Sequence, residues 1–364
     1  MSTAVSIDEA TRANPTRVPL HGRMHAWRRR TITWLLRRVM PPARNLVREG
    51  ELPVAGIQRV LICRPNHRLG NTVMLTALMS EIESRFPGAE VDVLGSGGAT
   101  RSVYAGFDCL GELFLLDRRA LRRPFATIGT LRKLRAKRYD LVVDAAAGSS
   151  SGRIAASLAR ARFQLSVDAL GSDVPTHFAA RPVRALRRAL GVADATPVPN
   201  LDLRLSAAER VAGAAALARV LRVPDPSGPT LAIFPNATGR KCLDATWWQT
   251  FVSELLARVG PLRIVELVAA DGQSRIGNAY PTYFTSDPRK LAAFIDAAGI
   301  YVSADCGVMH LAAATSAITI GIFGATDPER YAPYGPRNTG FRSDNGCPVA
   351  SATRAAAHLR GAIR

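Results

Sequence analysis

The chain has 364 residues, 47% hydrophobic and 21% charged, ordinary globular values that exclude whole-chain disorder, collagen or coiled coil and predict two domains. Its net charge of +19 favours anionic partners such as acidic lipids, phosphorylated small molecules or nucleic acids. Aromatic residues make up only 6% of the chain and form no motif with the basic residues, so a nucleic-acid partner is not predicted.

Residues 1–50 are predicted to form a basic, partly disordered segment. Between residues 23 and 50, Trp and Leu alternate with Arg at a roughly helical period that stops at Pro41, which indicates an amphipathic helix. Such a helix either lies on an anionic membrane surface or packs on the main body with a solvated Arg face, and both interpretations stay open. The chain starts with early acids and lacks long uncharged apolar runs, so neither a secretory signal nor a membrane-spanning helix is predicted.

A first series of strands and helices follows, within a predicted domain of residues 51–195. Apolar runs of five or six residues predict buried strands, and the stretch between the first two has a helical pattern that ends at Pro87. Strands separated by helices indicate a doubly wound parallel sheet. The strands are Arg59–Cys63, Glu90–Leu94 and Tyr139–Asp144, and the helix is Asn71–Arg85. The Arg-rich spans 118–138 and 181–188 are interpreted as solvated helix faces.

A second α/β series is predicted after a linker at residues 191–205, which holds two prolines and few helix signals. Ser206 and Glu209 have the spacing of a capping box that opens a helix to about Leu221. The second domain is predicted to cover residues 206–345, followed by a C-terminal helix at 346–364. Its predicted strands are Thr230–Phe234, Arg263–Val268 and Gly299–Ser303.

The most informative chemistry lies where the last of these strands ends and the next helix begins, near Gly307. Ligands bind at the carboxyl ends of parallel strands, and a helix start offers unpaired N–H groups to a phosphate. Gly307 would let a phosphate approach closely, Asp305 could hold a sugar hydroxyl, and His310 could reach a phosphate oxygen. The alternative is an Asp cap followed by a core histidine, and the residues alone leave both open.

Three segments in order resemble glycosyltransferase family 9, the heptosyltransferases of lipopolysaccharide assembly. The first is RVLICRPNHRLGNTVMLTALMSEIESRFPGAEVDVLGS, the second LAIFPNATGRKCLDATWWQTFVSEL, and the third SADCGVMHLAAATSAITIGIFGATDPERYAPYGP. Together with the strands between them they cover most of residues 58–337. The resemblance implies a GT-B architecture, with two Rossmann-like doubly wound parallel-sheet domains that face each other across a cleft.

The same resemblance implies an enzyme that moves heptose or a related sugar with inversion at the anomeric carbon. Its partners would be a nucleotide-diphosphate sugar on the C-terminal domain and a lipopolysaccharide-core or other lipid-linked or phosphorylated saccharide on the N-terminal domain. It would need no metal and no cofactor. It would be cytoplasmic and peripheral on the inner face of the cytoplasmic membrane. The five cysteines fit a reducing compartment, because they are odd in number, widely spaced and without a CxxC pair.

By the resemblance, the residues that contact the donor are Asp305, Cys306, Gly307 and His310, with Cys306 in place of the usual threonine. Without a metal, the departing diphosphate needs cationic side chains and helix N–H groups. Lys241 suits this role because it follows a strand of the second series and is one of only four lysines, and Arg240 would assist it.

The chain departs from the family in the N-terminal turn. Gly70 in this turn is expected to let a phosphate approach, but it is followed by Asn71 instead of the aspartate that the family uses as general base. An amide has no useful basicity near neutral pH. The base is therefore His67 in the same turn or Asp144 at a neighbouring strand end, or a substrate phosphate takes the proton, or the protein is a catalytically silent saccharide- or nucleotide-binding protein. The acid that would hold the donor ribose is also undetermined, with Glu266 and Asp271 as weak candidates.

Overall fold

The computed structural model describes residues 45–117, 124–145, 150–168, 177–193, 196–224, 228–343 and 346–362. The helix predicted between residues 23 and 40 lies outside the described residues, as does the side chain of Arg240. None of the helices in the described ranges combines the length and the apolar composition that a membrane crossing requires.

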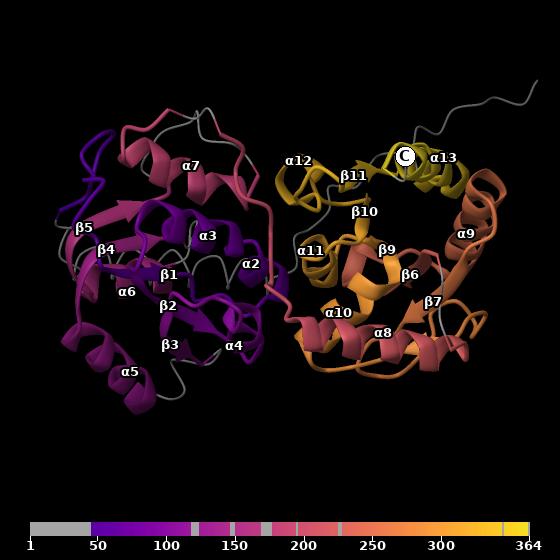
Figure 1. The fold of residues 1–364 in the computed structure, drawn as a ribbon, viewed down its shortest axis with the longest axis horizontal. Helices are drawn as coiled ribbons and strands as arrows, with labels where there is room; N and C mark the ends of the chain where they lie inside the picture. Colours follow the sequence, from indigo (N-terminus) through magenta and orange to yellow (C-terminus); the bar gives the residue numbers. More distant parts are fainter. Residues whose placement is uncertain are drawn as a thin grey trace, which may run out of the picture. The chain divides into compact units, whose positions relative to one another are not determined.

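The first half of the chain forms a five-stranded parallel sheet with the strand order β3-β2-β1-β4-β5 (Figure 1). The predicted strands are confirmed, and one of them continues to Ser96. Strands buried on both faces are apolar at successive positions, which is why these runs are recognisable in the sequence. The strands are β1 Arg59–Cys63, β2 Glu90–Ser96, β3 Leu110–Leu116, β4 Arg138–Asp144 and β5 Arg160–Ser166.

Helices cover both faces of this sheet. On one face α2, α3, α4 and α7 pack in the largest core cluster, and on the other face α5 and α6 pack over Leu61 and Val142. The bounds are α2 Leu69–Val73, α3 Thr76–Arg85, α4 Ala99–Tyr104, α5 Pro124–Ala136, α6 Ser150–Leu158 and α7 Ala180–Ala189. The single helix predicted over 71–85 is wrong in one respect: it is two helices, because the chain turns after Val73 and the Thr76 hydroxyl donates to the Val73 carbonyl at 2.8 Å.

The interpretation of residues 181–188 as a wholly solvated face is also wrong, because Arg187 is only 3% exposed. Its guanidinium donates two hydrogen bonds of 2.7 Å to the carboxylate of Glu81 on α3, and a third of 2.6 Å to the carbonyl of Thr196. A buried charge of this kind needs a partner and further hydrogen bonds, and both are provided. Arg187 therefore fastens α7 and the start of the linker to α3.

The second half forms a six-stranded parallel sheet with the order β11-β10-β9-β6-β7-β8, as in a second doubly wound fold (Figure 1). The fold class predicted from the sequence, two parallel-sheet α/β halves, is confirmed. The strands are β6 Thr230–Phe234, β7 Arg263–Leu267, β8 Thr282–Tyr283, β9 Gly299–Ala304, β10 Ile318–Phe323 and β11 Thr339–Arg342.

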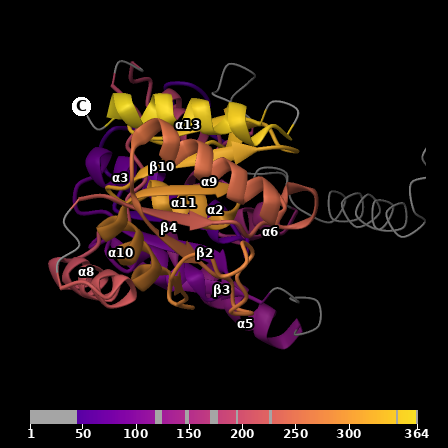
Figure 2. The same ribbon diagram turned by 90° about the vertical axis from the view of Figure 1, so that its right-hand side faces the viewer.

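Figure 2 shows α9 and α13 on one side of this sheet and α8 and α10 on the other, and the core clusters have the same division. The predicted capping box is confirmed: the Ser206 hydroxyl accepts from the Glu209 amide, and the Glu209 carboxylate accepts from the Ser206 amide. The remaining elements are α8 Ala207–Leu221, the 3-10 turn η2 Gly239–Lys241, α9 Ala245–Val259, α10 Pro288–Ala298, α11 Gly307–Ala313, α12 Pro328–Tyr331 and α13 Pro348–Ala362.

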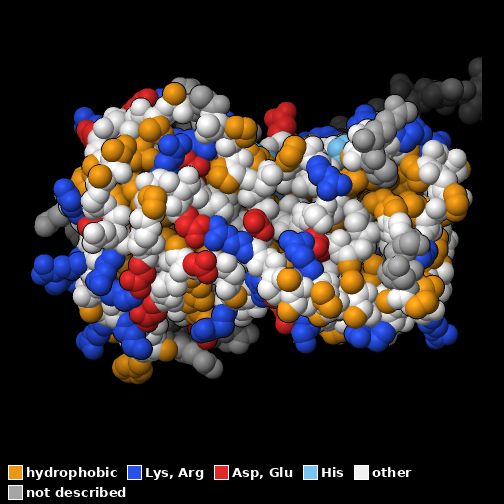
Figure 3. Space-filling view, in the orientation of Figure 1, with side chains coloured by type: hydrophobic (Ala, Val, Ile, Leu, Met, Phe, Trp, Pro, Cys, Tyr) orange, Lys and Arg blue, Asp and Glu red, His pale blue; other side chains and the backbone are white. Residues whose placement is uncertain are grey.

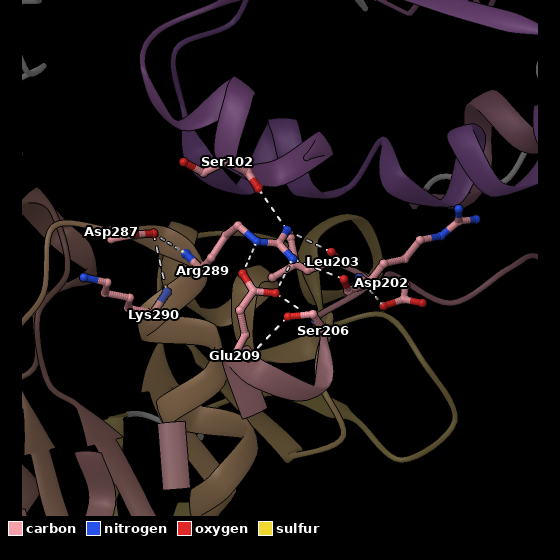
Figure 4. Close-up of polar contacts among 9 residues, drawn as sticks. Ser102, Asp202, Leu203, Ser206, Glu209, Asp287, Arg289 and Lys290 are labelled. Carbon is pink, nitrogen blue, oxygen red and sulfur yellow. Dashed lines mark hydrogen bonds and ion pairs between the residues drawn. The ribbon is translucent and has the colours of Figure 1, made fainter. Parts of the chain in front are cut away.

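The two sheets are joined by residues 196–206, which contain no helix or strand. Arg289 at the start of α10 holds this joint (Figure 4). Its guanidinium pairs with the Glu209 carboxylate at 2.5 and 2.8 Å and donates to the carbonyls of Ser102 in α4, Leu203 and Arg204 at 3.0–3.1 Å. This bidentate contact lowers the pKa of Glu209 to about 2. One arginine thus ties the second half to both the first half and the linker.

The linker is also fixed from the other side. Arg204 has a positive φ of 50° and pairs with Glu83 of α3, and its guanidinium lies 4.2 Å from the ring centre of Phe107. The largest core cluster includes side chains of α10 and α11 together with those of the first half. One core cluster thus continues from the first half into the second, and no division of the core marks a boundary at the linker. The domain boundaries at residues 195 and 206 stay predictions.

Candidate active site

The charged residues predicted in the second half meet at the carboxyl edge of its sheet. Asp305 follows β9 and is only 6% exposed. Its Oδ2 lies 2.6 Å from the Lys241 ammonium, which reaches across from η2, and accepts a hydrogen bond from the Thr326 hydroxyl. Lys241 stays 29% exposed, so the pair presents a cation to solvent over a buried carboxylate.

Cys306 is the N-cap of α11, but its thiol does not cap the helix. The Sγ atom lies 3.5 Å from the Ser303 hydroxyl and 3.8 Å from the Tyr301 hydroxyl, so it points back along β9. Burial raises the pKa of the Cys306 thiol, which keeps it protonated at neutral pH. Replacement of the usual threonine therefore leaves a neutral group that faces the strand.

His310 is buried at 4% exposure, and burial lowers its pKa to about 4. The ring is therefore neutral at pH 7, although the charge of Asp305 acts in the opposite direction. Its Nδ1 has no hydrogen-bond partner among the described residues. The ring packs against α2 of the first half, since a Cβ on Gly70 would lie 2.5 Å from His310 Cδ2.

The two helix starts from the two halves touch each other directly. A Cβ on Gly70 would lie 3.3 Å from the Gly307 Cα, and a Cβ on Gly307 would lie 3.2 Å from the Gly70 amide nitrogen. Gly70 was expected in a turn open to phosphate, but it lies inside α2 and is buried. Its missing side chain makes room for α11, and Asn71 next to it is half-buried beside this contact.

The two residues predicted as alternative bases lie on different elements of the first half. His67 is exposed and packs beside Gly97, and with Asp117 it lines a pocket of about 660 Å³ at the ends of β2 and β3. Asp144 ends β4, in register with Cys63 of β1. Burial, and secondarily the charge of Asp144, raise the pKa of the Cys63 thiol. The structure therefore brings Lys241, Asp305, His310 and Gly70 together. His67 lies in the loop before α2, and Asp144 lies at the end of β4.

The candidates for the ribose acid have partners of their own. Glu266 is fully buried in β7 and accepts from the Ser274 hydroxyl at 2.5 Å and from the Arg275 amide at 2.7 Å. Asp271 is exposed and pairs with the Arg275 side chain, which also lines a pocket of about 340 Å³ between β6 and α9. Of the two, only Asp271 has a carboxylate accessible to a ligand.

A histidine that the sequence analysis did not select also lies at this edge. His177 accepts from the Ala179 amide at Nδ1 (3.2 Å), so its Nε2 carries the proton and donates to the Ala332 carbonyl (2.9 Å). Burial lowers the pKa of His177, and its charge would lower that of His310. Both ring nitrogens are engaged, so His177 joins the two halves and does not act as a base. No sequence pattern marks it, because its segment is irregular.

An arginine cluster lies beside it. Arg64, directly after β1, donates to the Ala145 carbonyl at 2.5 Å, and its guanidinium lies 6.0 Å from the ring centre of Phe178. Tyr331 stacks on Phe178 with ring centres 4.9 Å apart, and Arg330 lies over the same ring at 5.1 Å. Burial lowers the pKa of Arg64. Cations from both halves therefore surround one aromatic ring at this edge.

Comparisons with known proteins agree with this architecture. Residues 289–357 match the model of glycosyltransferase family 9 (heptosyltransferase), and no curated protein matches the sequence. The structure is similar to that of E. coli heptosyltransferase WaaC with ADP, at 19% identity and a TM-score of 0.64 over 84% of this chain and 100% of that one.

Two further solved structures share the fold. A family 9 glycosyl transferase from Veillonella parvula has 15% identity and a TM-score of 0.66, over 87% of this chain and 92% of that one. E. coli ADP-heptose lps heptosyltransferase II has 16% identity and a TM-score of 0.61, over 84% of this chain and 98% of that one. At such identities the structures show a shared GT-B fold, and the match to the family model is confined to residues 289–357. The chain thus has a heptosyltransferase-like GT-B fold, with a C-terminal segment similar to glycosyltransferase family 9.

Proposed function

We propose that this protein transfers a heptose-like sugar from a nucleotide-diphosphate donor to a lipopolysaccharide-core or other lipid-linked or phosphorylated saccharide. The observation that carries the proposal is the partly exposed side chain of Lys241, whose ammonium is held by buried Asp305 next to the start of α11. An ammonium has three donors, and the contact with Asp305 uses one of them. Among the described residues no other side chain pairs with this ammonium, so the remaining donors can meet the donor's diphosphate. WaaC, which shares the fold, has been solved with ADP and with an ADP-fluoroheptose.

In this reaction the acceptor oxygen attacks C1 of the donor sugar from the face opposite the diphosphate, which inverts the anomeric carbon. The bond from C1 to the diphosphate oxygen breaks, and its electron pair stays on the diphosphate. Lys241 stabilises that charge, with help from Arg240 and the Gly307 amide, and no metal or cofactor is needed for this step. His310 is neutral, so it contributes a hydrogen bond to the donor and no charge.

The acceptor hydroxyl must also lose its proton, and we assign that task to His67. Asn71 cannot accept it, burial lowers the pKa of His310 to about 4 and makes it a weak base, and both nitrogens of His177 are engaged. His67 is exposed and lines the 660 Å³ pocket in the half that the family uses for the acceptor. Asp144 is the next candidate.

The second candidate function, favoured by Asn71, is a catalytically silent saccharide- or nucleotide-binding protein. A panel of nucleotide sugars, each tested for thermal stabilisation and then for transfer, separates the two. A ligand at a hundredfold excess over its dissociation constant adds about 2.7 kcal/mol to the free energy of unfolding. Stabilisation with transfer supports the enzyme; stabilisation by a donor without transfer to any acceptor saccharide supports the silent protein. No stabilisation by any nucleotide sugar contradicts the transferase and the nucleotide-binding form of the silent protein.

The acceptor chemistry and the charge of +19 support action at an anionic membrane, as a peripheral protein of the inner face of the cytoplasmic membrane. The basic N-terminal segment 1–50 is one membrane contact under this proposal. Its deletion is expected to reduce sedimentation with anionic vesicles at low salt. Equal sedimentation of the full-length and shortened chains would remove the segment from the proposal.

A further inference from the structure

We infer that the outer face of α5 docks on an anionic lipid bilayer. This "α5 face" consists of Phe125, Ile128, Arg132 and Arg135. The inference deepens the proposed function by naming the surface that contacts the membrane. Only its last step, entry of a lipid-linked acceptor, rests on the proposed function.

The first observation is exposed apolar area. Phe125 is 88% exposed and Ile128 is 46% exposed. Neighbouring exposed apolar side chains with polar residues around them mark an interaction site, and Phe125 and Ile128 lie about one turn apart on α5. The four residues follow the spacing i, i+3, i+7 and i+10, which places them on one side of a helix. Leu134 on the opposite side is buried under the sheet.

The second observation is charge. α5 carries Arg132, Lys133 and Arg135, all exposed, and contains no acidic residue. The sequence has no acid anywhere between Asp117 and Asp140. Figure 3 shows basic and hydrophobic side chains side by side at the lower left, where Figure 1 places α5. Apolar side chains beside cations complement the acyl chains and the anionic headgroups of a bilayer, which is why the occupant is a lipid surface.

The third observation is what lies behind the helix. Ala126, Thr127 and Thr130 of α5 line the 660 Å³ pocket that also contains His67. Leu115 of β3, 37% exposed, lines the same pocket. The α5 face and the pocket therefore lie on two sides of the same helix, α5. A saccharide attached to a lipid in the bilayer would enter the pocket beside α5 while its lipid stayed in the membrane.

The exposed apolar residue Val211 lacks this combination. Val211 is 70% exposed, but it lies on α8 between Arg210 and Ala212, two residues from the acidic Glu209. Val211 therefore provides a matched control for a substitution of an exposed apolar side chain, and Arg219 and Arg222 at the end of α8 provide a control for loss of two cations.

The test uses the full-length protein and sedimentation with vesicles of phosphatidylcholine, with or without phosphatidylglycerol, at low salt. Phe125→Glu/Ile128→Glu is expected to lower partition to anionic vesicles by about tenfold or more, and Val211→Glu to leave it unchanged. Arg132→Gln/Arg135→Gln is expected to lower it by severalfold, and Arg219→Gln/Arg222→Gln much less. Unchanged melting temperatures verify that the variants are folded.

Two results overturn the inference. Wild type that does not sediment with anionic vesicles shows that the occupant is not a membrane, a protein partner being then the alternative. If the wild type and the Phe125→Glu/Ile128→Glu variant sediment with anionic vesicles to the same extent, another segment makes the contact.

Transfer assays keep the outcome separate from the proposed function. With a water-soluble acceptor saccharide the α5 variants are expected to retain wild-type turnover, and with a vesicle-bound acceptor they are expected to lose it in proportion to their partition. Vesicle binding by a wild type that transfers no sugar leaves the docking surface intact and overturns the function.

Discussion

The carboxyl edges of the two sheets differ in how completely the protein itself fills them. At the second sheet, Lys241, Asp305 and His310 are held by contacts within the protein, and two of the three are buried. At the first sheet, His67 is exposed in an open 660 Å³ pocket. A preorganised edge suits a donor whose diphosphate is always the same, whereas an open edge suits an acceptor that arrives on a larger carrier.

The largest expected effect tests the open edge. His67→Ala should lower turnover by about 10²–10⁴-fold, the usual contribution of a general base. Donor affinity measured by calorimetry should stay the same, because His67 lies in the other half. His358→Ala, which removes a partly buried histidine of α13 that bonds to the Arg337 carbonyl, is the control and should change neither quantity.

Asn71→Asp complements this test. If the base has moved to His67, the new carboxylate should be neutral or modestly harmful. Strong activation of a nearly inactive wild type would mean that the site is degenerate. Full turnover in His67→Ala would direct attention to Asp144.

The next effect tests the filled edge. Lys241→Ala removes the cation over Asp305 and should lower turnover by about 10²–10³-fold, as loss of one preorganised donor does elsewhere. Lys290→Ala on α10, an exposed lysine in the same half, should have no effect on turnover. If the two variants behave alike in transfer assays, Lys241 does not face the diphosphate.

The buried histidine predicts a pH dependence of stability. The pKa of His310 is lowered to about 4 in the folded chain, against about 6.5 when unfolded. Between pH 6.5 and 4, His310 is protonated in the unfolded chain but stays neutral in the folded chain. Proton binding then favours the unfolded chain, so the free energy of unfolding decreases as the pH falls from 6.5 towards 4. The loss is at most about 3 kcal/mol.

Urea unfolding at pH 7, 5.5 and 4.5 measures this loss. His310→Gln should reduce the pH dependence between pH 6.5 and 4, whereas His358→Gln should retain it. Identical curves for wild type and His310→Gln would show that the ring is hydrated rather than buried.

The smallest effect tests the contact between the two edges. Gly70→Ala would place a methyl group 2.5 Å from the His310 ring and should lower the free energy of unfolding by about 1–3 kcal/mol. Gly129→Ala in α5 meets no atom within 4 Å and should raise stability by about 0.5–1 kcal/mol. Denaturant midpoints give both values, and opposite signs are required.

A second substitution locates the cause. His310→Ala combined with Gly70→Ala should cost less than the sum of the two single changes, because the methyl group then has space. Strict additivity would mean that α2 and α11 do not touch in solution.

The fold was largely predictable because its signals are local. The run RVLIC is apolar at successive positions since β1 is covered on both faces, and the Ser206–Glu209 capping box is contained within four residues. Arg187 was not predictable, because its partner Glu81 is 106 residues away and nothing local separates it from the exposed arginines of α5.

The site was predictable as a set of residue types and not as an arrangement. Lys241 and Asp305 were each selected, but their mutual contact spans 64 residues and requires η2 to sit beside β9. The burial of His310 depends on Gly70 in the other half, so the sequence left its role open. His177 has a role only because its irregular segment reaches Ala332.

The joint held by Arg289 has a consequence for building hybrid enzymes from related chains. The Arg289 guanidinium donates hydrogen bonds to three backbone carbonyls of the first half and the linker, and it pairs with one carboxylate of the second half. In a chimera that exchanged only the residues after the linker, the carbonyls that accept from Arg289 would come from a different parent. Their positions would then not match the Arg289 side chain, which is only 14% exposed. Donor and acceptor specificities on this scaffold are therefore best recombined by exchanging strand-edge loops, with the Arg289 joint and the core it borders inherited from one parent.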